Sequence, residues 1–461
     1  MKKRICLSTS IVFLFFCQLC LGESDPKIVL KARNAEFEKE VIEVAQGVYT
    51  AVGFGVSPTS MIVAESGLII IDTQIDSATA RAVLEEFRKI TDKPVSAIVL
   101  THGHGDHTGG LGVFASAGEG VQIWAREDFN KETRTFADAG LTVQGTRGAR
   151  QGGFLLEPAN RINNGVAKPY FPKRGGEVFA AVDTKPSHFL SGDRQRIKVG
   201  GTEINLVAAT GETYDALYVW YPEERVVFTG DNFYKSWPNL YAIRGTPYRD
   251  VLAWINSLSM MIEENPKHLV GGHTRPITGE EQATTTLTNY RDAIQSVFDQ
   301  TIAGMNRGLT PDELVEVVEL PEKYAQLDYL REYYGNIEWG VRAIFSGYLG
   351  WFDGNPSNLF PLSPNEEAIQ LAALSGGAAN LFKNARESLD TNPQWTAQLC
   401  DHLLALSYRV DDVKHLKADA LERIGGKILT ATGRNYYFTV AKQLRDSTHA
   451  RNDSTLPMAA H

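Results

Sequence analysis

Three histidines and one aspartate lie within six residues, in the run His-Gly-His-Gly-Asp-His at positions 102–107. Imidazole nitrogens and carboxylate oxygens are common ligands of divalent metals, and such a cluster has little use in core packing. The sequence therefore predicts that His102, His104, Asp106 and His107 hold two metal ions. The alternative interpretation is a polar loop that happens to be rich in histidine, in a chain with 10 histidines.

The motif directly follows a short apolar stretch, 95–100, which has the composition of a buried strand. Residues two apart in extended backbone project to the same side, so His102 and His104 can bind one ion together. We expect a sharp turn to bring Asp106 and His107 to a second ion, since glycines permit such turns. Four glycines are available for it: Gly103, Gly105, Gly109 and Gly110.

Four residues cannot complete the coordination of two ions, so further ligands are expected in loops after later strands. Three residues of ligand type follow apolar stretches: Glu212, Asp231 and His273. Taken singly, each is more often a solvated carboxylate or a core histidine. Loops that follow neighbouring strands reach one edge of a sheet, so the three together are predicted to complete a two-ion site.

Strand and helix patterns alternate up to about residue 276, which is typical of a mixed α/β domain. Antiparallel strands are expected from about residue 28 onward, ending in a buried strand at 67–73. The helices and later strands are expected at 78–90, 203–210, 217–221, 225–229 and 250–264.

From Glu280 onward the strand patterns end and amphipathic helical patterns take over. They are interrupted by a loop at 350–364, and a polar tail is expected at 447–461. The predicted helices are 284–307, 311–320, 365–374, 394–406, 413–424 and 429–445. We expect them to form a small helical domain that packs directly on the α/β part.

The overall composition excludes some classes of protein. A hydrophobic content of 43% and a charged content of 22% are typical of a folded protein. The net charge of −9 argues against a nucleic-acid partner, which favours a basic surface.

The first residues have the pattern of a targeting segment. A basic start is followed by an apolar run, 11–20, that is too short to cross a bilayer. We predict a signal peptide over residues 1–22, cleavage after Gly22, and a periplasmic or secreted protein without a stable membrane span. The alternative is an uncleaved anchor. Cleavage would leave Cys400 as the one cysteine, a predicted core residue, so no intramolecular disulfide is expected.

The metal motif, Asp72 and the three later ligand positions resemble the metallo-β-lactamase superfamily, whose fold is an αββα sandwich. Most of that superfamily has histidine at the position of Glu212, and glutamate there resembles the alkylsulfatase branch. The segments 348–356 and 435–438 resemble the alkylsulfatase dimerisation domain. The resemblance implies an α/β catalytic domain over residues 23–310, an all-helical dimerisation domain over residues 311–446, and a homodimer.

The resemblance also implies a dinuclear zinc centre that supplies a hydroxide for attack on an ester. One zinc would be bound by His102, His104 and Glu212, and the other by Asp106, His107 and His273, with Asp231 as the bridge. Asp106 and Asp231 would then be catalytic carboxylates. Asp72 would either orient a ligand or cap backbone amides, and these two interpretations are equally good.

Arg244 matches the sulfate-binding arginine of this branch, because a planar guanidinium can grip two sulfate oxygens. The alternative is an ordinary surface ion pair. A glycine-rich basic stretch, 145–176, would either attract an anionic substrate or form a solvated loop. Within it, Asn163 and Asn164 could donate hydrogen bonds, whereas Gln151 and the following residues lack the tyrosine that the family has near the sulfate.

The expected activity is therefore hydrolysis of sulfate esters of alkyl alcohols. One alternative keeps the zinc site but changes the substrate to a β-lactam, a lactone or a phosphodiester. Glu212 and the helical region argue against a β-lactamase, and export and acidity argue against a nuclease. A second alternative is a non-catalytic, zinc-binding dimeric scaffold.

Overall fold

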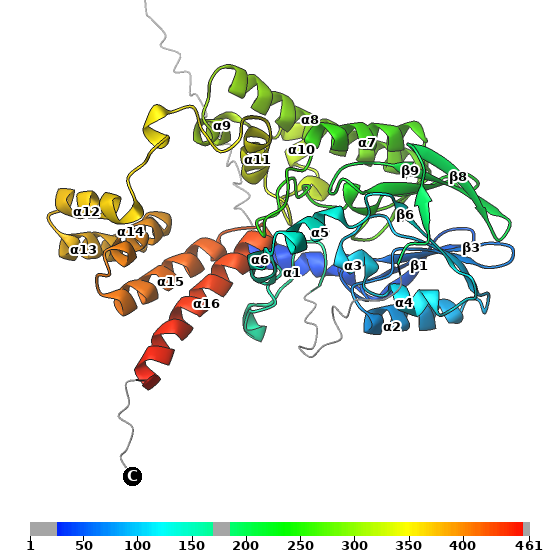
Figure 1. Cartoon of the computed structure of the whole chain (residues 1–461), viewed down its shortest axis with the longest axis horizontal. Helices are drawn as coiled ribbons and strands as arrows, with labels where there is room; N and C mark the ends of the chain where they lie inside the picture. Colours follow the sequence, from blue (N-terminus) through cyan, green and yellow to red (C-terminus); the bar gives the residue numbers. More distant parts are fainter. Residues whose placement is uncertain (1–24, 169–184, 455–461) are drawn as a thin grey trace, which may run out of the picture.

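The computed structural model of the chain describes residues 25–168 and 185–454 (Figure 1). The predicted signal peptide and its cleavage site lie outside the described residues, as do Lys173 and Arg174 of the basic stretch. None of the described helices has the length and apolar character needed to cross a bilayer.

Two sheets form the centre of the α/β part. The first has the strand order β1-β2-β3-β4-β5-β6-β7, antiparallel from β1 to β4 and parallel from β4 to β7. Its strands are β1 (Glu40–Ala45), β2 (Val48–Val52), β3 (Thr59–Val63), β4 (Leu68–Ile71), β5 (Val95–Val99), β6 (Gln122–Arg126) and β7 (His188–Leu190).

The second sheet has the order β13-β12-β11-β10-β9-β8, in which only the β11–β12 pair is parallel. Its strands are β8 (Arg194–Val199), β9 (Thr202–Ala208), β10 (Leu217–Tyr221), β11 (Val226–Phe228), β12 (His268–Val270) and β13 (Ile277–Thr278). The predicted strands at 203–210, 217–221 and 225–229 correspond to β9, β10 and β11.

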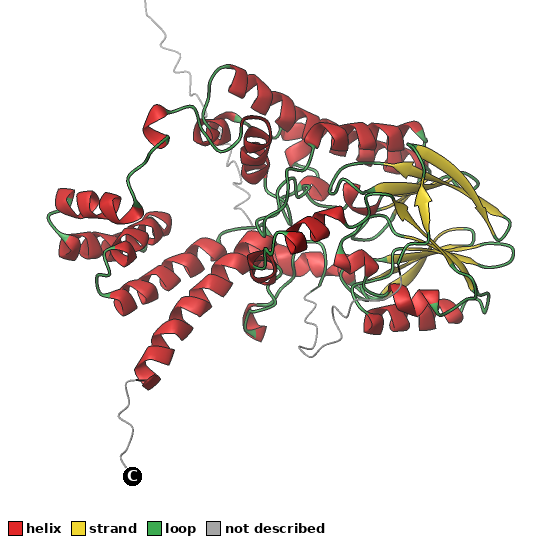
Figure 2. Ribbon diagram, in the orientation of Figure 1, coloured by secondary structure: helices red, strands yellow, loops and turns green. Residues whose placement is uncertain are grey.

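The continuous apolar run of β4 is explained by burial on both faces of its sheet. Ile69 and Ile71 pack with Leu206 and Val219 of the second sheet, while Leu68 faces the helices outside. The helices α2 (Ser77–Arg88) and α4 (Leu111–Ala115) cover the first sheet, and α7 (Val251–Glu263) and α8 (Glu280–Asn306) cover the second. The predicted αββα sandwich is therefore confirmed (Figure 2).

The expectation of strands from residue 28 is wrong for the first few residues. They form α1 (Pro26–Arg33), and the strands begin at β1. The Asp25 side chain accepts a hydrogen bond from the Lys27 amide at 2.9 Å, and Pro26 opens the helix. A carboxylate cap followed by proline is a helix-start signal that outweighs the short apolar alternation.

The C-terminal part is helical, as predicted. Its first helices pack directly on the α/β part beside α8, as expected, whereas the later ones extend away from it (Figure 1). Its helices are α9 (Pro311–Val317), α10 (Glu322–Ala325), α11 (Ile337–Leu349), α12 (Pro364–Leu374), α13 (Ala378–Ser388), α14 (Pro393–Ala405), α15 (Val410–Gly426) and α16 (Ala431–Ser454). The sequence reasoning missed α11 and α13. It also ended the last helix too early, because α16 continues past residue 446 and buries Thr448 within hydrogen-bond distance of His415.

Cys400 lies fully buried among apolar residues of α12, α13, α14 and α15. Burial raises the pKa of its thiol to about 12, so the group stays protonated and behaves as a small apolar side chain. The prediction of a core cysteine is confirmed.

Candidate metal centre and active site

All seven predicted metal ligands lie in loops or short helical turns that follow strands. His102 and His104 follow β5, and Asp106 and His107 lie in the four-residue helix α3 (Gly105–Thr108). In the second sheet, Glu212 follows β9, Asp231 lies in a turn after β11, and His273 follows β12. The two sheets thus contribute ligands from opposite sides of one site.

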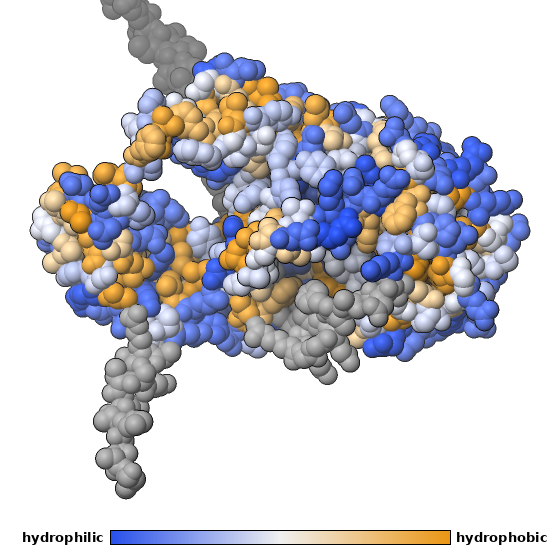
Figure 3. Space-filling view, in the orientation of Figure 1, coloured by the Kyte–Doolittle hydropathy of each residue, from blue (hydrophilic) through white to orange (hydrophobic). Residues whose placement is uncertain are grey.

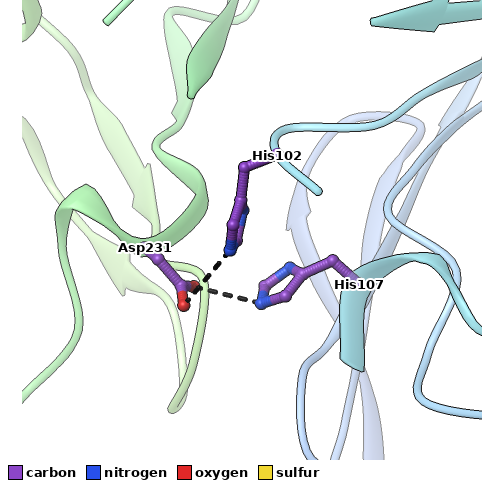
Figure 4. A group of neighbouring side chains, drawn as sticks. All are labelled: His102, His107 and Asp231. Atoms are coloured by element: carbon purple, nitrogen blue, oxygen red, sulfur yellow. Dashed lines mark ion pairs between the residues drawn. The ribbon is translucent and has the colours of Figure 1, made fainter. Parts of the chain in front are cut away.

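Asp231 lies at the centre of this cluster. Its carboxylate is 3.2 Å from His107 Nε2, 3.3 Å from His273 Nε2 and 3.7 Å from His102 Nε2. Figure 4 shows the carboxylate pointing from the second sheet toward two imidazoles of the first. A carboxylate with this many imidazole neighbours has the position that a bridging ligand needs.

The donor atoms form three overlapping groups, in each of which the atoms lie within 4.8 Å of one another. The groups are His102, His107 and Asp231; Asp106, His107 and His273; and His104, Glu212 and Asp231. The second group equals one of the two predicted ligand sets. The other predicted set is divided between the remaining groups, which share Asp231. The structure therefore brings every predicted ligand to one place.

Three donor atoms show that this cluster is incomplete without a cation. His107 Nε2, Glu212 Oε2 and Asp231 Oδ1 are buried without a well-formed hydrogen bond among the described residues. Unsatisfied buried polar atoms are costly, and a bound cation removes that cost. Nitrogen and oxygen donors without thiolate also have the chemistry that catalytic zinc sites use. The residues present fit a metal centre.

The electrostatics of the cluster favour bound cations as well. Burial lowers the pKa of His102 and His104, which keeps both imidazoles neutral and able to ligate. Burial opposes ionisation of Asp231, but His273, His107 and His102 outweigh it and hold the pKa of this carboxyl well below its usual range. Asp231 is therefore anionic in the site.

Asp72 fulfils both of its proposed roles. One carboxylate oxygen accepts a hydrogen bond from the Thr101 amide at 2.9 Å, as a backbone cap does. The other accepts from the Thr101 hydroxyl at 2.8 Å and lies 2.7 Å from His107 Nδ1. Asp72 thereby orients His107 so that Nε2 faces Asp231.

The glycines after the motif serve close packing rather than a sharp turn. Gly109 has an ordinary φ of −66°, but a Cβ there would lie 1.9 Å from the carbonyl oxygen of Ile75. A Cβ on Gly110 would lie 2.0 Å from the carbonyl oxygen of Thr73. The turn that presents Asp106 and His107 is instead the first turn of α3.

A cavity of about 450 Å³ opens beside the ligands. Its lining includes the polar residues Arg244 and Glu132 and the apolar residues Val56, Ile75 and Phe154. Such a cavity can take a small molecule that has one polar end and one apolar end.

Arg244 lines this cavity directly beside one of the predicted metal ligands. Its Nη2 lies 3.1 Å from His104 Nε2, and its Nη1 lies 3.8 Å from a carboxylate oxygen of Glu132. The side chain is 19% exposed, so the guanidinium is accessible from the cavity. The prediction of a surface ion pair is thus the poorer description, because the arginine lines the cavity itself.

The backbone around Arg244 is held by one face of α6 (Val143–Gln151). The Gln144 side chain donates to the carbonyl of Gly245 at 2.9 Å, and Arg147 donates to the carbonyl of Ile243 at 2.7 Å. The side-chain oxygen of Gln151 accepts from the Arg244 amide at 3.0 Å. These three residues recur at helical spacing and together fix the segment that carries the arginine.

The described residues of the basic stretch form hydrogen bonds and an ion pair with other parts of the protein. Arg150 donates to the Gln443 side chain at 3.0 Å, Arg161 donates to a backbone carbonyl, and Lys168 pairs with Glu38. Asn163 donates to the carbonyl of Leu30 at 2.6 Å, so its amide is also used internally. Asn164 does line the cavity.

Sequence reasoning missed several residues at this site. Glu132, Tyr334 and Thr432 line the cavity, and Arg249 contacts Glu212. Tyr334 and Thr432 belong to the helical region, far along the chain from the motif. The local sequence pattern does not identify such residues, because tertiary packing brings them to the site.

Comparisons with known proteins agree with this fold and site. Residues 52–273 match the family model of the Metallo-beta-lactamase superfamily, and residues 310–447 match that of Alkyl sulfatase dimerisation. The chain is 35% identical over 392 residues to a linear primary-alkylsulfatase of Pseudomonas sp. (strain ATCC 19151), an alignment that covers 83% of this chain and 73% of that protein.

Two further similarities lead to the same family. An (R)-specific secondary-alkylsulfatase of Pseudomonas sp. is 30% identical, with 88% of this chain and 62% of that protein aligned. The solved structure of the stereoselective inverting sec-alkylsulfatase Pisa1 from Pseudomonas sp. superposes with a TM-score of 0.80 at 29% identity, covering 88% of this chain and 66% of that one. The fold and site define a metal-dependent hydrolase of the metallo-β-lactamase superfamily. Within that superfamily, the chain belongs to the alkylsulfatase family.

Proposed function

We propose that this protein is a dinuclear zinc hydrolase that releases sulfate from alkyl sulfate esters. The observation that carries the proposal is the position of Arg244, whose guanidinium faces the same cavity as the converged metal ligands. Two bound zinc ions would supply a nucleophile at neutral pH and polarise the ester oxygens.

The protein's own residues would bind and orient the substrate. Arg244 would donate two hydrogen bonds to sulfate oxygens, in the forked geometry that a guanidinium offers. Val56, Ile75 and Phe154 are apolar residues of the cavity lining that could contact the alkyl chain.

The lining of the cavity carries charges of both signs. Asp106, Glu132, Glu212 and Asp231 line it together with Arg244. A sulfate ester is an anion, so bound cations would offset the carboxylates and strengthen its attraction to the cavity. Substrate binding is therefore expected to be tighter when the metal centre is loaded.

We further propose that the protein is an exported homodimer. The basic and apolar pattern of residues 1–22 supports export. Large apolar side chains are exposed on α12 and the segment before it, including Trp351 at 75%, Phe360 at 94% and Leu374 at 87%. Apolar surface is visible over this part of the molecule in Figure 3. A second copy that covers it would remove this apolar surface from water.

The experiment that tests the function measures sulfate release from short and long alkyl sulfates by the zinc-loaded protein. A chelated sample is the control, and a β-lactam, a lactone and a phosphodiester are assayed in parallel. We expect sulfate release that chelation abolishes and zinc restores. Turnover of another substrate without sulfate release would keep the metal hydrolase and reject the sulfate ester.

A further inference from the structure

A buried arginine contacts one of the predicted metal ligands from behind. Nη1 of Arg249 lies 2.5 Å from Oε1 of Glu212, and the two side chains are only 2% and 3% exposed. The arginine lies in the segment before α7, whose first turn is capped by the next residue, Asp250. A well-formed helix start therefore fixes the backbone from which the arginine reaches the ligand.

The two oxygens of Glu212 have different surroundings. Oε1 is taken by the arginine, whereas Oε2 is buried without a hydrogen-bond partner among the described residues. The carboxylate also groups with donor atoms of His104 and Asp231 within 4.8 Å. The Arg249 guanidinium thus holds Oε1 of Glu212, and Oε2 remains available to ligate a metal ion.

The arginine itself is held in place by the protein. Nη1 also donates to the carbonyl oxygen of Asn239 at 2.6 Å. The backbone amide of Glu212 donates to the Asn232 side chain at 3.2 Å, and Trp254 donates to the carbonyl of Asn232 at 2.9 Å. Asn232 thus holds the backbone of Glu212, and Arg249 holds its carboxylate.

We propose that Arg249 is a positioning residue for Glu212. It holds Oε1, so that Glu212 offers Oε2 alone to the cation shared with His104 and Asp231. It also balances the glutamate charge, so that the pair acts toward this cation as a neutral ligand of one donor atom. The inference rests on the metal centre of the proposed function and is independent of the substrate.

A purely structural ion pair would give a different result on mutation. Removing one partner of a buried pair is destabilising wherever the pair lies, so a loss of stability alone does not distinguish the two roles. A positioning role predicts a selective loss of metal from the folded protein. Residues that orient metal ligands typically change metal affinity by roughly 10- to 100-fold when mutated.

The experiment compares metal content, metal affinity and folding in full-length variants. Zinc per chain is measured by elemental analysis after gel filtration, affinity by competition with a chromophoric chelator, and folding by circular dichroism. The test variant is Arg249→Met. The matched control is Arg434→Met, which removes another buried arginine. Arg434 belongs to α16 and donates to the backbone carbonyl of Asn160.

We expect two zinc ions in the wild type and in Arg434→Met. In folded Arg249→Met, we expect one zinc to be lost or its affinity to fall at least about tenfold. Two zinc ions with unchanged affinity in folded Arg249→Met would overturn the inference. A wild type that binds no zinc would instead overturn the metal centre of the proposed function.

A second variant keeps the test decisive if Arg249→Met does not fold. The double variant Glu212→His with Arg249→Met replaces the charged pair by a neutral nitrogen ligand and an apolar side chain. If the pair acts as one neutral ligand, the double variant folds and regains the second zinc. A folded double variant that holds only one zinc, like a protein lacking the ligand altogether, would contradict the inference.

Discussion

The α/β sandwich and the C-terminal helices differ in how completely one chain buries their apolar side chains. In the sandwich, Ile69 and Ile71 face the second sheet and Leu68 faces the covering helices, so both faces of β4 are buried. Around α12, Phe360 is 94% exposed and Leu374 is 87% exposed. The sandwich thus buries these apolar side chains within a single chain, whereas the helical region leaves large apolar side chains exposed.

The two regions are nevertheless joined at the site. Asn435 of α16 donates to the backbone carbonyl of Gln151 at 3.3 Å, and the side chain of Gln151 accepts from the Arg244 amide. The sandwich thus contributes all the predicted metal ligands, while the helical region supports the arginine that faces them. We therefore expect some mutations to change zinc binding and others to change substrate binding.

The largest effect is expected in the sandwich, from Asp231→Asn. This change keeps the shape of the side chain but removes the charge that lies between three histidines. We expect loss of zinc and a fall in sulfate release of about 1,000-fold or more. Elemental analysis and initial rates are the measurements. Asp128→Asn, at a side chain 56% exposed, is the control, and a zinc content equal in both variants would contradict the prediction.

The next effect is expected from Arg244→Gln, which keeps all seven predicted ligands but removes a guanidinium that lies 3.1 Å from one of them, at His104 Nε2. Hydrogen bonds to a charged group contribute about 1.5–3 kcal/mol, so kcat/KM for alkyl sulfates should fall about 10- to 100-fold. Zinc content should remain that of the wild type. The comparison fails if zinc is lost as well, because the arginine would then belong to the metal centre.

The seven candidate ligands, which the structure brings together, could be picked out from the sequence because local features mark them. His102 to His107 form one compact motif, and Glu212, Asp231 and His273 each follow an apolar strand. Arg249 and Gln151 have no such signal, since their roles depend on where two loops meet. The early strand prediction failed at α1 for a related reason: a short apolar alternation was given more weight than the cap at Asp25.

A smaller effect should show how α6 supports the arginine of the cavity. Gln151→Met removes the side-chain acceptor of the Arg244 amide while keeping a similar volume. One hydrogen bond contributes about 0.5–1.5 kcal/mol, so KM for alkyl sulfates should rise about 2- to 10-fold. The zinc content and kcat should stay near the wild-type values. Gln326→Met, at the exposed residue that follows α10, is the control, and a fall in kcat without a change in KM would argue against positioning.

The smallest change, a factor of two in mass, tests the exposed region itself. The double variant Phe360→Ser with Leu374→Ser removes two of its most exposed apolar side chains. If a second copy covers this surface, light scattering after gel filtration should show the mass fall from two chains to one. Phe189→Ser, at a side chain 44% exposed in β7 of the sandwich, should leave the mass unchanged. A double variant that stays dimeric would place the interface elsewhere. A wild type that is already monomeric would contradict the dimer, and with it the proposal that a second copy covers this surface. Zinc content should be the same in all three proteins, because every predicted ligand comes from the sandwich of one chain.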